Sequence, residues 1–160
     1  MIAKSTFSNV GGTKICQQIE SSEVKSIIKN DNLVEIKIEN QEFYHIYQSL
    51  LENNIMVEDF QKEENEIRFR IKKDVRNKVI EILDNKYPSC RLEQEEIVKL
   101  SIVGYGITQD NRVLNQVIEM LKKHHIQISN INLSQSKIEI LVKEIENDIV
   151  QLIHGKLIQK

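Results

Sequence analysis

The stretch Ile67-Arg68-Phe69-Arg70-Ile71 alternates apolar and charged residues. Successive side chains of a β-strand point to opposite faces, so this alternation predicts a strand with one buried face. A similar stretch, Ile138-Glu139-Ile140-Leu141-Val142, follows about 71 residues later in the chain. The same offset superposes Ile55 on Ile126, and each of these residues opens a shorter apolar segment. The constant register predicts that the chain is a tandem repeat.

Outward from these strands, both repeats show the order strand, helix, strand, strand, helix. In the first repeat, residues 34–38 alternate as a strand, and Asp74 is a candidate N-cap for a second helix that ends before Pro88. Residues 90–92 are expected to form a short closing strand. The helix after residue 38 has apolar residues at helical spacing: Phe43, Ile46, Tyr47, Leu50 and Leu51. In the second repeat, residues 98–103 are a predicted strand and residues 126–128 open another, while residues 113–121 and 149–157 mark the predicted helices.

The predicted fold is α+β, with two ferredoxin-like βαββαβ sandwiches whose antiparallel sheets carry their helices on one face. The second repeat ends at a helix near Lys160, so its sheet lacks a fourth strand, and an unpaired edge is a liability. Residues 12–17 are the candidate for that strand. We therefore expect residues 21–92 to form a first unit that is inserted into a second unit made of residues 5–20 plus 93–160. Residues 24–28 are expected to be a further short strand or an extended connector.

Composition excludes several classes of partner and site. The formal net charge is -2 with both signs interleaved, which gives no basic footprint for nucleic acid or for a membrane surface. No apolar run is long enough to span a bilayer, and the N-terminus lacks an apolar signal segment. Cys16 and Cys90 are expected to be reduced thiols. His124 and His125 have no further ligand at useful spacing, so neither a metal nor another cofactor is expected.

Three stretches resemble one family, the aspartate kinases. Residues 98–107, VKLSIVGYGI, are similar to the opening of that family's second ACT unit, and residues 128–138, ISNINLSQSKI, to a strand pair in the same unit. Residues 5–15, STFSNVGGTKI, resemble the segment that leaves the kinase domain. Gly104 and Gly106 in the first stretch are expected to allow a close backbone approach at a strand end. The resemblance implies that the two units are ACT units, which sense amino acids.

The resemblance also implies a function in feedback control. Aspartate kinases phosphorylate the side-chain carboxylate of L-aspartate with ATP, at the first step towards lysine, threonine and methionine. No glycine-rich phosphate loop and no acid–base or nucleophilic cluster is present, so we expect this chain alone to bind but not to catalyse. The implied effector is L-lysine or L-threonine, and the implied partners are a kinase domain or catalytic subunit and a second copy in a homodimer. The implied location is the cytoplasm.

In the family, the effector lies where the first strand of the inner unit turns into its helix, at an interface between ACT units. A carboxylate there can accept hydrogen bonds from backbone N–H groups at the helix N-terminus. This chain has ENQE at residues 39–42, where the family usually carries DxPG. The matching candidate contacts are Ile38, Glu39, Asn40, Gln41, Glu42 and Phe43 in this segment, Gln61 on the next strand, and Gln127 and Ile128 in the outer unit.

Other interpretations of these residues stay open. Glu39 and Glu42 are also typical of ordinary helix starts, where the helix dipole favours acidic residues. The chain could be a free-standing ACT sensor for another enzyme or for transcription, although the STF-like segment argues against that. An acylphosphatase-like enzyme would need an arginine in a phosphate-binding loop after the first strand, and residues 38–42 contain none.

Overall fold

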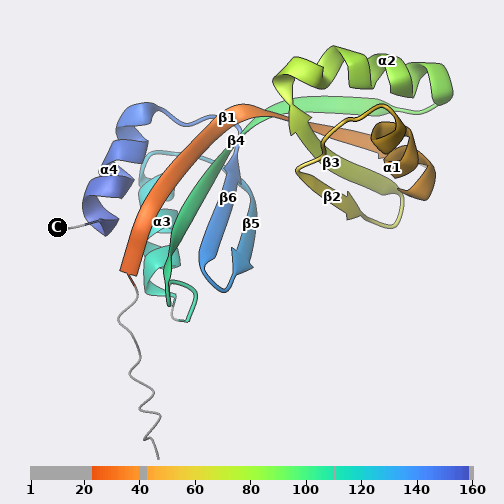
Figure 1. The fold of residues 1–160 in the computed structure, drawn as a ribbon. Helices are drawn as coiled ribbons and strands as arrows, with labels where there is room; N and C mark the ends of the chain where they lie inside the picture. The colour runs from red at the N-terminus through yellow and green to blue at the C-terminus, as the bar shows by residue number, and fades with distance from the viewer. Residues whose placement is uncertain (1–22, 40–42, 110, 159–160) are drawn as a thin grey trace, which may run out of the picture.

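The computed structural model describes residues 23–39, 43–109 and 111–158, which form one six-stranded sheet and four helices (Figure 1). The elements are β1 (Glu23–Glu39), α1 (Phe43–Glu52), β2 (Asp59–Lys62), β3 (Glu66–Lys72), a 3₁₀ turn (Lys73–Val75), α2 (Arg76–Lys86), β4 (Leu92–Tyr105), α3 (Arg112–Lys123), β5 (Ile128–Ser134), β6 (Lys137–Val142) and α4 (Asn147–Leu157). The predicted α+β class is confirmed, and none of the described helices is long and apolar enough to cross a membrane.

The strand order is β2-β3-β1-β4-β6-β5, and all neighbouring strands are antiparallel. Of the described strands, only β1 and β4 run through both parts of the sheet (Figure 1). β3 pairs with residues 33–39 of β1, whereas β6 pairs with residues 98–103 of β4. We call the part built on β2, β3, α1 and α2 the first half and the part built on β5, β6, α3 and α4 the second half. Each half shows the predicted order of the repeat.

One predicted boundary between strands was wrong. Residues 90–92 and 98–103 were expected to be separate strands, but β4 is continuous from Leu92 to Tyr105. The polar residues Glu93 to Glu95 between them pair with Lys37 to Glu35 of β1. They are polar because this part of β4 is an edge of the first half, where side chains reach solvent. β4 therefore continues through residues 93–95, although this segment lacks the alternation of apolar and polar residues that the prediction relied on.

The fourth strand of the second half is the beginning of β1. Residues 23–30 pair with residues 99–105 of β4, so the segment expected to be a short strand or a connector is a strand. This is the place that residues 12–17 were expected to occupy. Those residues lie outside the described part of the chain, and the division into residues 21–92 and residues 5–20 plus 93–160 stays a prediction.

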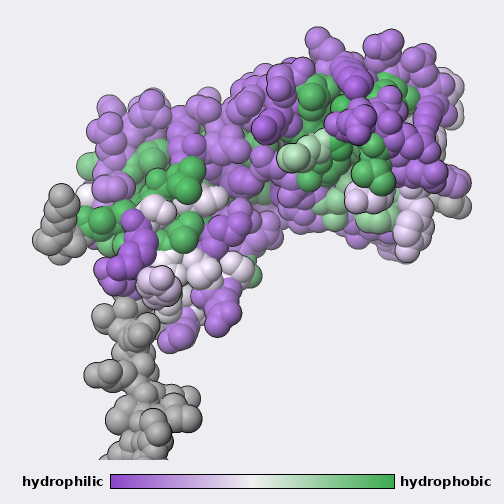
Figure 2. All heavy atoms as spheres, in the orientation of Figure 1, coloured by the Kyte–Doolittle hydropathy of each residue, from purple (hydrophilic) through white to green (hydrophobic). Residues whose placement is uncertain are grey.

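Each half has its own apolar core between the sheet and its helices. The first-half core contains Val34, Ile36 and Ile38 of β1 with Ile67, Phe69 and Ile71 of β3, under Ile46 and Leu50 of α1 and Val79 and Leu83 of α2. The second-half core contains Leu100 and Ile102 of β4 with Ile138 and Ile140 of β6, under Val117 and Leu121 of α3 and Ile153 of α4. Two apolar residues of the predicted α1 stripe, Tyr47 and Leu51, are instead 45% and 60% exposed. Figure 2 shows that the visible surface is mostly hydrophilic and that some hydrophobic residues are exposed on it.

Two local predictions can be compared with the backbone. A Cβ on Gly104 would collide with the carbonyl oxygen of Glu23 and would lie 2.9 Å from the Cα of Val24, so the glycine does allow β1 and β4 to approach closely. Gly106 has a φ of 63°, a left-handed conformation that glycine adopts without strain. Asp74, the expected N-cap, lies instead inside the 3₁₀ turn, and α2 begins after Val75 without a side-chain cap.

Candidate functional site

The candidate segment begins at the end of β1. Ile38 is 1% exposed and lies between Ile67 and Leu92 in the first-half core, so its side chain is closed to a ligand. Glu39 ends the strand; its backbone N–H donates to the carbonyl of Arg91 at 3.2 Å, and its carboxylate is 3.8 Å from the Arg91 guanidinium. Asn40, Gln41 and Glu42 lie outside the described residues, and their predicted contacts stay predictions.

Phe43 begins α1 and anchors it to the sheet. Its ring meets Phe60 of β2 edge to face, with centroids 4.6 Å apart, and Phe60 stacks on Phe69 of β3 at 5.3 Å. The Phe43 side chain therefore belongs to the core, and only its backbone N–H is suited to a ligand. α1 has no acidic residue in its first turn, so no carboxylate within the helix offsets the positive end of its dipole.

Gln61 lies on the edge strand β2, which pairs only with β3 among the described strands. Because neighbouring Phe60 packs on the core side, the Gln61 side chain points to the opposite, helix-free face. There its amide donates to the carboxylate of Asp59 at 3.3 Å. A ligand that contacts both the start of α1 and Gln61 would have to lie at the free edge of β2.

Gln127 and Ile128 lie at the other edge of the sheet. Ile128 begins β5, which pairs only with β6 among the described strands, and Gln127 is exposed just before it. Gln127 lines a hollow of about 650 Å³ together with His124, His125 and the turn that follows β6. Strands β3, β1, β4 and β6 separate this edge from β2. Within one chain, the structure does not bring the two groups of candidate residues together.

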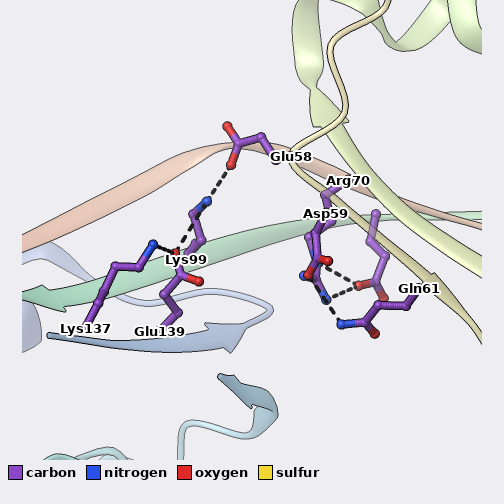
Figure 3. A network of polar contacts seen from close by, with 8 residues as sticks. Glu58, Asp59, Gln61, Arg70, Lys99, Lys137 and Glu139 are labelled. Carbon is purple, nitrogen blue, oxygen red and sulfur yellow. Dashed lines mark hydrogen bonds and ion pairs between the residues drawn. The ribbon is translucent and has the colours of Figure 1, made fainter. Parts of the chain in front are cut away.

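The helix-free face carries a charged network that sequence reasoning did not single out (Figure 3). Arg70 of β3, with a side chain only 5% exposed, is paired with Glu35 of β1 at 3.0 Å and with Asp59 of β2. Glu58 contacts Lys99 of β4, which is 4.0 Å from Glu139 of β6. The alternation in IRFRI was a usable signal, because it puts Arg68 and Arg70 on the face opposite Phe69. It could not identify their partners on other strands.

The charged side chains of this network on the helix-free face are paired with one another. The pKa of the Arg68 guanidinium is raised, chiefly by its hydrogen bond to Glu66. Among the described residues, every buried side-chain nitrogen and oxygen has a hydrogen-bond partner. The network therefore holds strands together rather than presenting unfilled donors to a ligand.

Neither metal nor thiol chemistry is indicated by the described part of the chain. It contains no group of three or more His, Cys, Asp or Glu residues that could hold a metal ion. Cys90 is half-buried and free, and burial raises the pKa of its thiol, which lowers the reactive thiolate fraction. Cys16 lies outside the described residues.

Comparison with known proteins relates this geometry to one family, although no protein-family profile matches the chain. An aspartokinase of Rickettsia felis is 30% identical over 152 residues, which cover 88% of this chain. An aspartokinase of Rickettsia prowazekii is 26% identical over 144 residues, or 84% of the chain. This chain is therefore covered over most of its length by aspartokinase homologues. It spans 38% and 32% of the lengths of these two relatives.

Solved aspartokinase structures share the fold. The ligand-free regulatory subunit of aspartate kinase from Thermus thermophilus superposes with a TM-score of 0.72 at 19% identity, over 86% of this chain and 99% of that subunit. E. coli aspartokinase III in complex with lysine and aspartate superposes with a TM-score of 0.64 at 17% identity, over 88% of this chain but 34% of that enzyme. The fold is therefore that of the ACT-type regulatory part of aspartate kinase, which confirms the predicted tandem ACT architecture.

Proposed function

We propose that the chain is a regulatory domain or subunit of an aspartate kinase, which binds an end-product amino acid and thereby controls aspartate phosphorylation allosterically. One observation carries this proposal: the fold accounts for nearly all of a regulatory subunit but only about a third of a whole aspartokinase. Lysine is the first candidate effector, since E. coli aspartokinase III has been crystallised with lysine. Threonine is the second. The expected partners are a kinase domain or catalytic subunit, and the expected location is the cytoplasm.

The opposite placement of the candidate residues bears on how an effector would be held. The start of α1 and Gln61 adjoin the free edge of β2, whereas Gln127 and Ile128 adjoin the free edge of β5. If all of them contact one ligand, two copies must contribute, with β2 of one copy near β5 of the other. The backbone N–H groups at the start of α1 would donate hydrogen bonds to the effector's carboxylate, and carbonyl or carboxylate oxygens would accept hydrogen bonds from its ammonium group.

A second copy would also cover apolar surface beside β2. Tyr44, Tyr47 and Leu51 of α1 are spaced along one side of the helix and are 78%, 45% and 60% exposed. α1 contains no Asp, Glu, Lys or Arg before Glu52. A helix with exposed aromatic and aliphatic residues and few charged ones, beside an edge strand, is suited to association. We therefore assign this surface to the homodimer interface.

Self-association provides the first test. Leu51→Glu should shift the chain from dimer to monomer in sedimentation velocity at micromolar concentration, because it buries a charge in the proposed interface. Leu152→Glu on α4 is the matched control, since Leu152 is also exposed, at 55%, but lies far from β2 in the second half. A wild-type chain that sediments as a monomer, or equal effects of both variants, would contradict the interface.

Titration calorimetry provides the second test. Lysine or threonine should bind with a micromolar to millimolar dissociation constant, roughly 4–8 kcal/mol, because a few charge-assisted hydrogen bonds provide the affinity. Gln61→Ala and Glu39→Ala should each weaken binding by about tenfold, or about 1.4 kcal/mol. Gln116→Ala on the exposed side of α3 should not.

Failure of the binding test would have a definite meaning. If none of the twenty amino acids nor diaminopimelate binds at millimolar concentration, the ENQE segment has lost sensing and the chain is a dimerising regulatory remnant. The alternative function is a free-standing ACT sensor. It would bind an amino acid but would not change the rate of an aspartate kinase catalytic subunit added to the same assay.

A further inference from the structure

The two halves are joined by a narrow connection. At the boundary, β1 and β4 are the only strands in the described part of the chain that continue from one half to the other. β3 pairs with β1 only as far as Leu33, and β6 pairs with β4 only as far as Val98. β1 carries an extra residue there: Asn30 is opposite Lys99 and Leu33 is opposite Ile97. Such a bulge bends and twists a strand pair locally. Among the described strands, two antiparallel strands with a bulge therefore form the hinge between two separately packed cores.

Side chains cross the inside of this bend. Leu33, Ile97 and Leu141 form a small apolar cluster, each no more than 3% exposed, on the helix-free face. Beside them Glu58 of the first half contacts Lys99 of the second half (Figure 3). Glu58 is held in the first half by its backbone N–H, which donates to the carbonyl of Arg70 at 2.8 Å. Lys99 is held in the second half by β-pairing with Leu141.

The Glu58–Lys99 contact is partly shielded from water. The two side chains are 23% and 20% exposed, and Lys99 also faces Glu139, whose side chain is 20% exposed. Glu139 is in turn 2.9 Å from Lys137. Charges at this depth attract more strongly than fully exposed pairs. Another ion pair near the bend, Lys143 with Glu95, has side chains that are 60% and 37% exposed and is expected to contribute less.

The space within the bend permits its angle to change. Glu58, Lys99, Glu139 and Leu141 line a hollow of about 370 Å³ that also reaches Asp59 and Arg70. If side chains filled the space between the two halves, they would overlap when the halves moved closer. The hollow leaves room for this movement, and the Glu58–Lys99 ion pair bridges it. The angle between the halves then depends on whether the charges are in contact.

We propose that the Glu58–Lys99–Glu139 chain is an electrostatic clamp that sets the angle between the two halves of the molecule. With the clamp intact, the halves stay in the bent arrangement of Figure 1. Without the clamp, the strand pair β1–β4 bends at the bulge and the two halves change their relative angle, while each half keeps its own core. The clamp is a property of this chain and does not depend on which effector, if any, the chain binds.

The clamp can be tested by the distance between the halves. Spin labels are attached to cysteines that replace exposed Asn85 on α2 and exposed Glu119 on α3, in a chain whose native cysteines are serines. The labelled chain is diluted with excess unlabelled chain, so that only distances within one copy are measured by double electron–electron resonance. Glu58→Gln and Lys99→Met should each give a shifted and broader distance distribution than the parent chain.

Two further arms separate the clamp from other effects. Lys137→Met is the matched control; it removes a cation from Glu139 but leaves the Glu58–Lys99 contact, so its distribution should match the parent. At about 1 M salt, the parent should broaden only part of the way towards the variants, because a partly shielded pair is screened less than an exposed one, and the variants should change little. Circular dichroism must show that each variant is folded. An unchanged distribution in folded Glu58→Gln would overturn the proposal, even if Lys99→Met changed it.

Discussion

Replacing Phe69 by alanine should lower the free energy of unfolding by about 3–5 kcal/mol, the largest effect that we expect from a single substitution in this chain. Phe69 is 1% exposed in the centre of β3 and stacks on Phe60 with the rings within 10° of parallel. The substitution removes this contact and leaves a cavity. Since Phe60 in turn supports Phe43, the start of α1 should also loosen.

Urea denaturation followed by circular dichroism measures this effect, and hydrogen exchange locates it. The amide protons of β3 and α1 should lose protection, while those of β6 and α3 should keep it, because the second half has a separate core. Met56→Ala is the control in the same half, since Met56 is 75% exposed and its truncation should change stability by less than about 0.5 kcal/mol. Equal loss of protection in both halves would show that their cores unfold as one unit.

Replacing Arg70 by methionine should destabilise the first half by about 2–4 kcal/mol, because it leaves a shielded carboxylate without its cation. The Glu35 side chain is only 12% exposed and its main partner is Arg70, at 3.0 Å. Asp59, the other acid, is 31% exposed and can recover some hydration, which keeps the expected effect below that of a fully buried pair.

A double-mutant cycle gives the sharper measurement for this pair. Arg70→Met combined with Glu35→Gln should be less destabilised than the sum of the single variants, because the second change removes the stranded charge. Arg68→Met is the matched control two residues away; its side chain is 34% exposed, and its loss should cost about 1 kcal/mol or less. Additive effects of Arg70→Met and Glu35→Gln would show that the two side chains do not interact in solution.

Local pattern was sufficient for most of the secondary structure. The alternation at residues 67–71 and 138–142 placed β3 and β6 correctly, because a period of two is a property of the strand itself. The helix after residue 38 was also correct, but its stripe of five apolar residues was too wide. Residues one position apart on a helix are about 100° apart, so Phe43, Ile46 and Leu50 face the core, while Tyr47 and Leu51 turn to solvent.

The candidate site was predicted less completely than the fold. Resemblance to the family put forward residues that lie at strand edges, but it could not say that Gln61 and Gln127 adjoin opposite edges of one sheet. The resemblance also proposed Ile38 as an effector contact, although the Ile38 side chain is buried in the first-half core. The Arg70 and Lys99 pairs were missed because each joins strands that are distant along the chain, and alternation identifies a face without identifying a neighbour.

The sequence by itself determined that the chain is a repeat of strands and helices, which faces of them are apolar, and which family it resembles. Only the tertiary structure decided that residues 23–39 and 92–105 are single long strands shared by both halves, and that charged side chains bridge the bend between them. The physical reason is the range of the interactions. Side-chain periodicity is set by neighbouring backbone dihedrals, whereas strand pairing and ion pairing are chosen among all segments that the folded chain brings together.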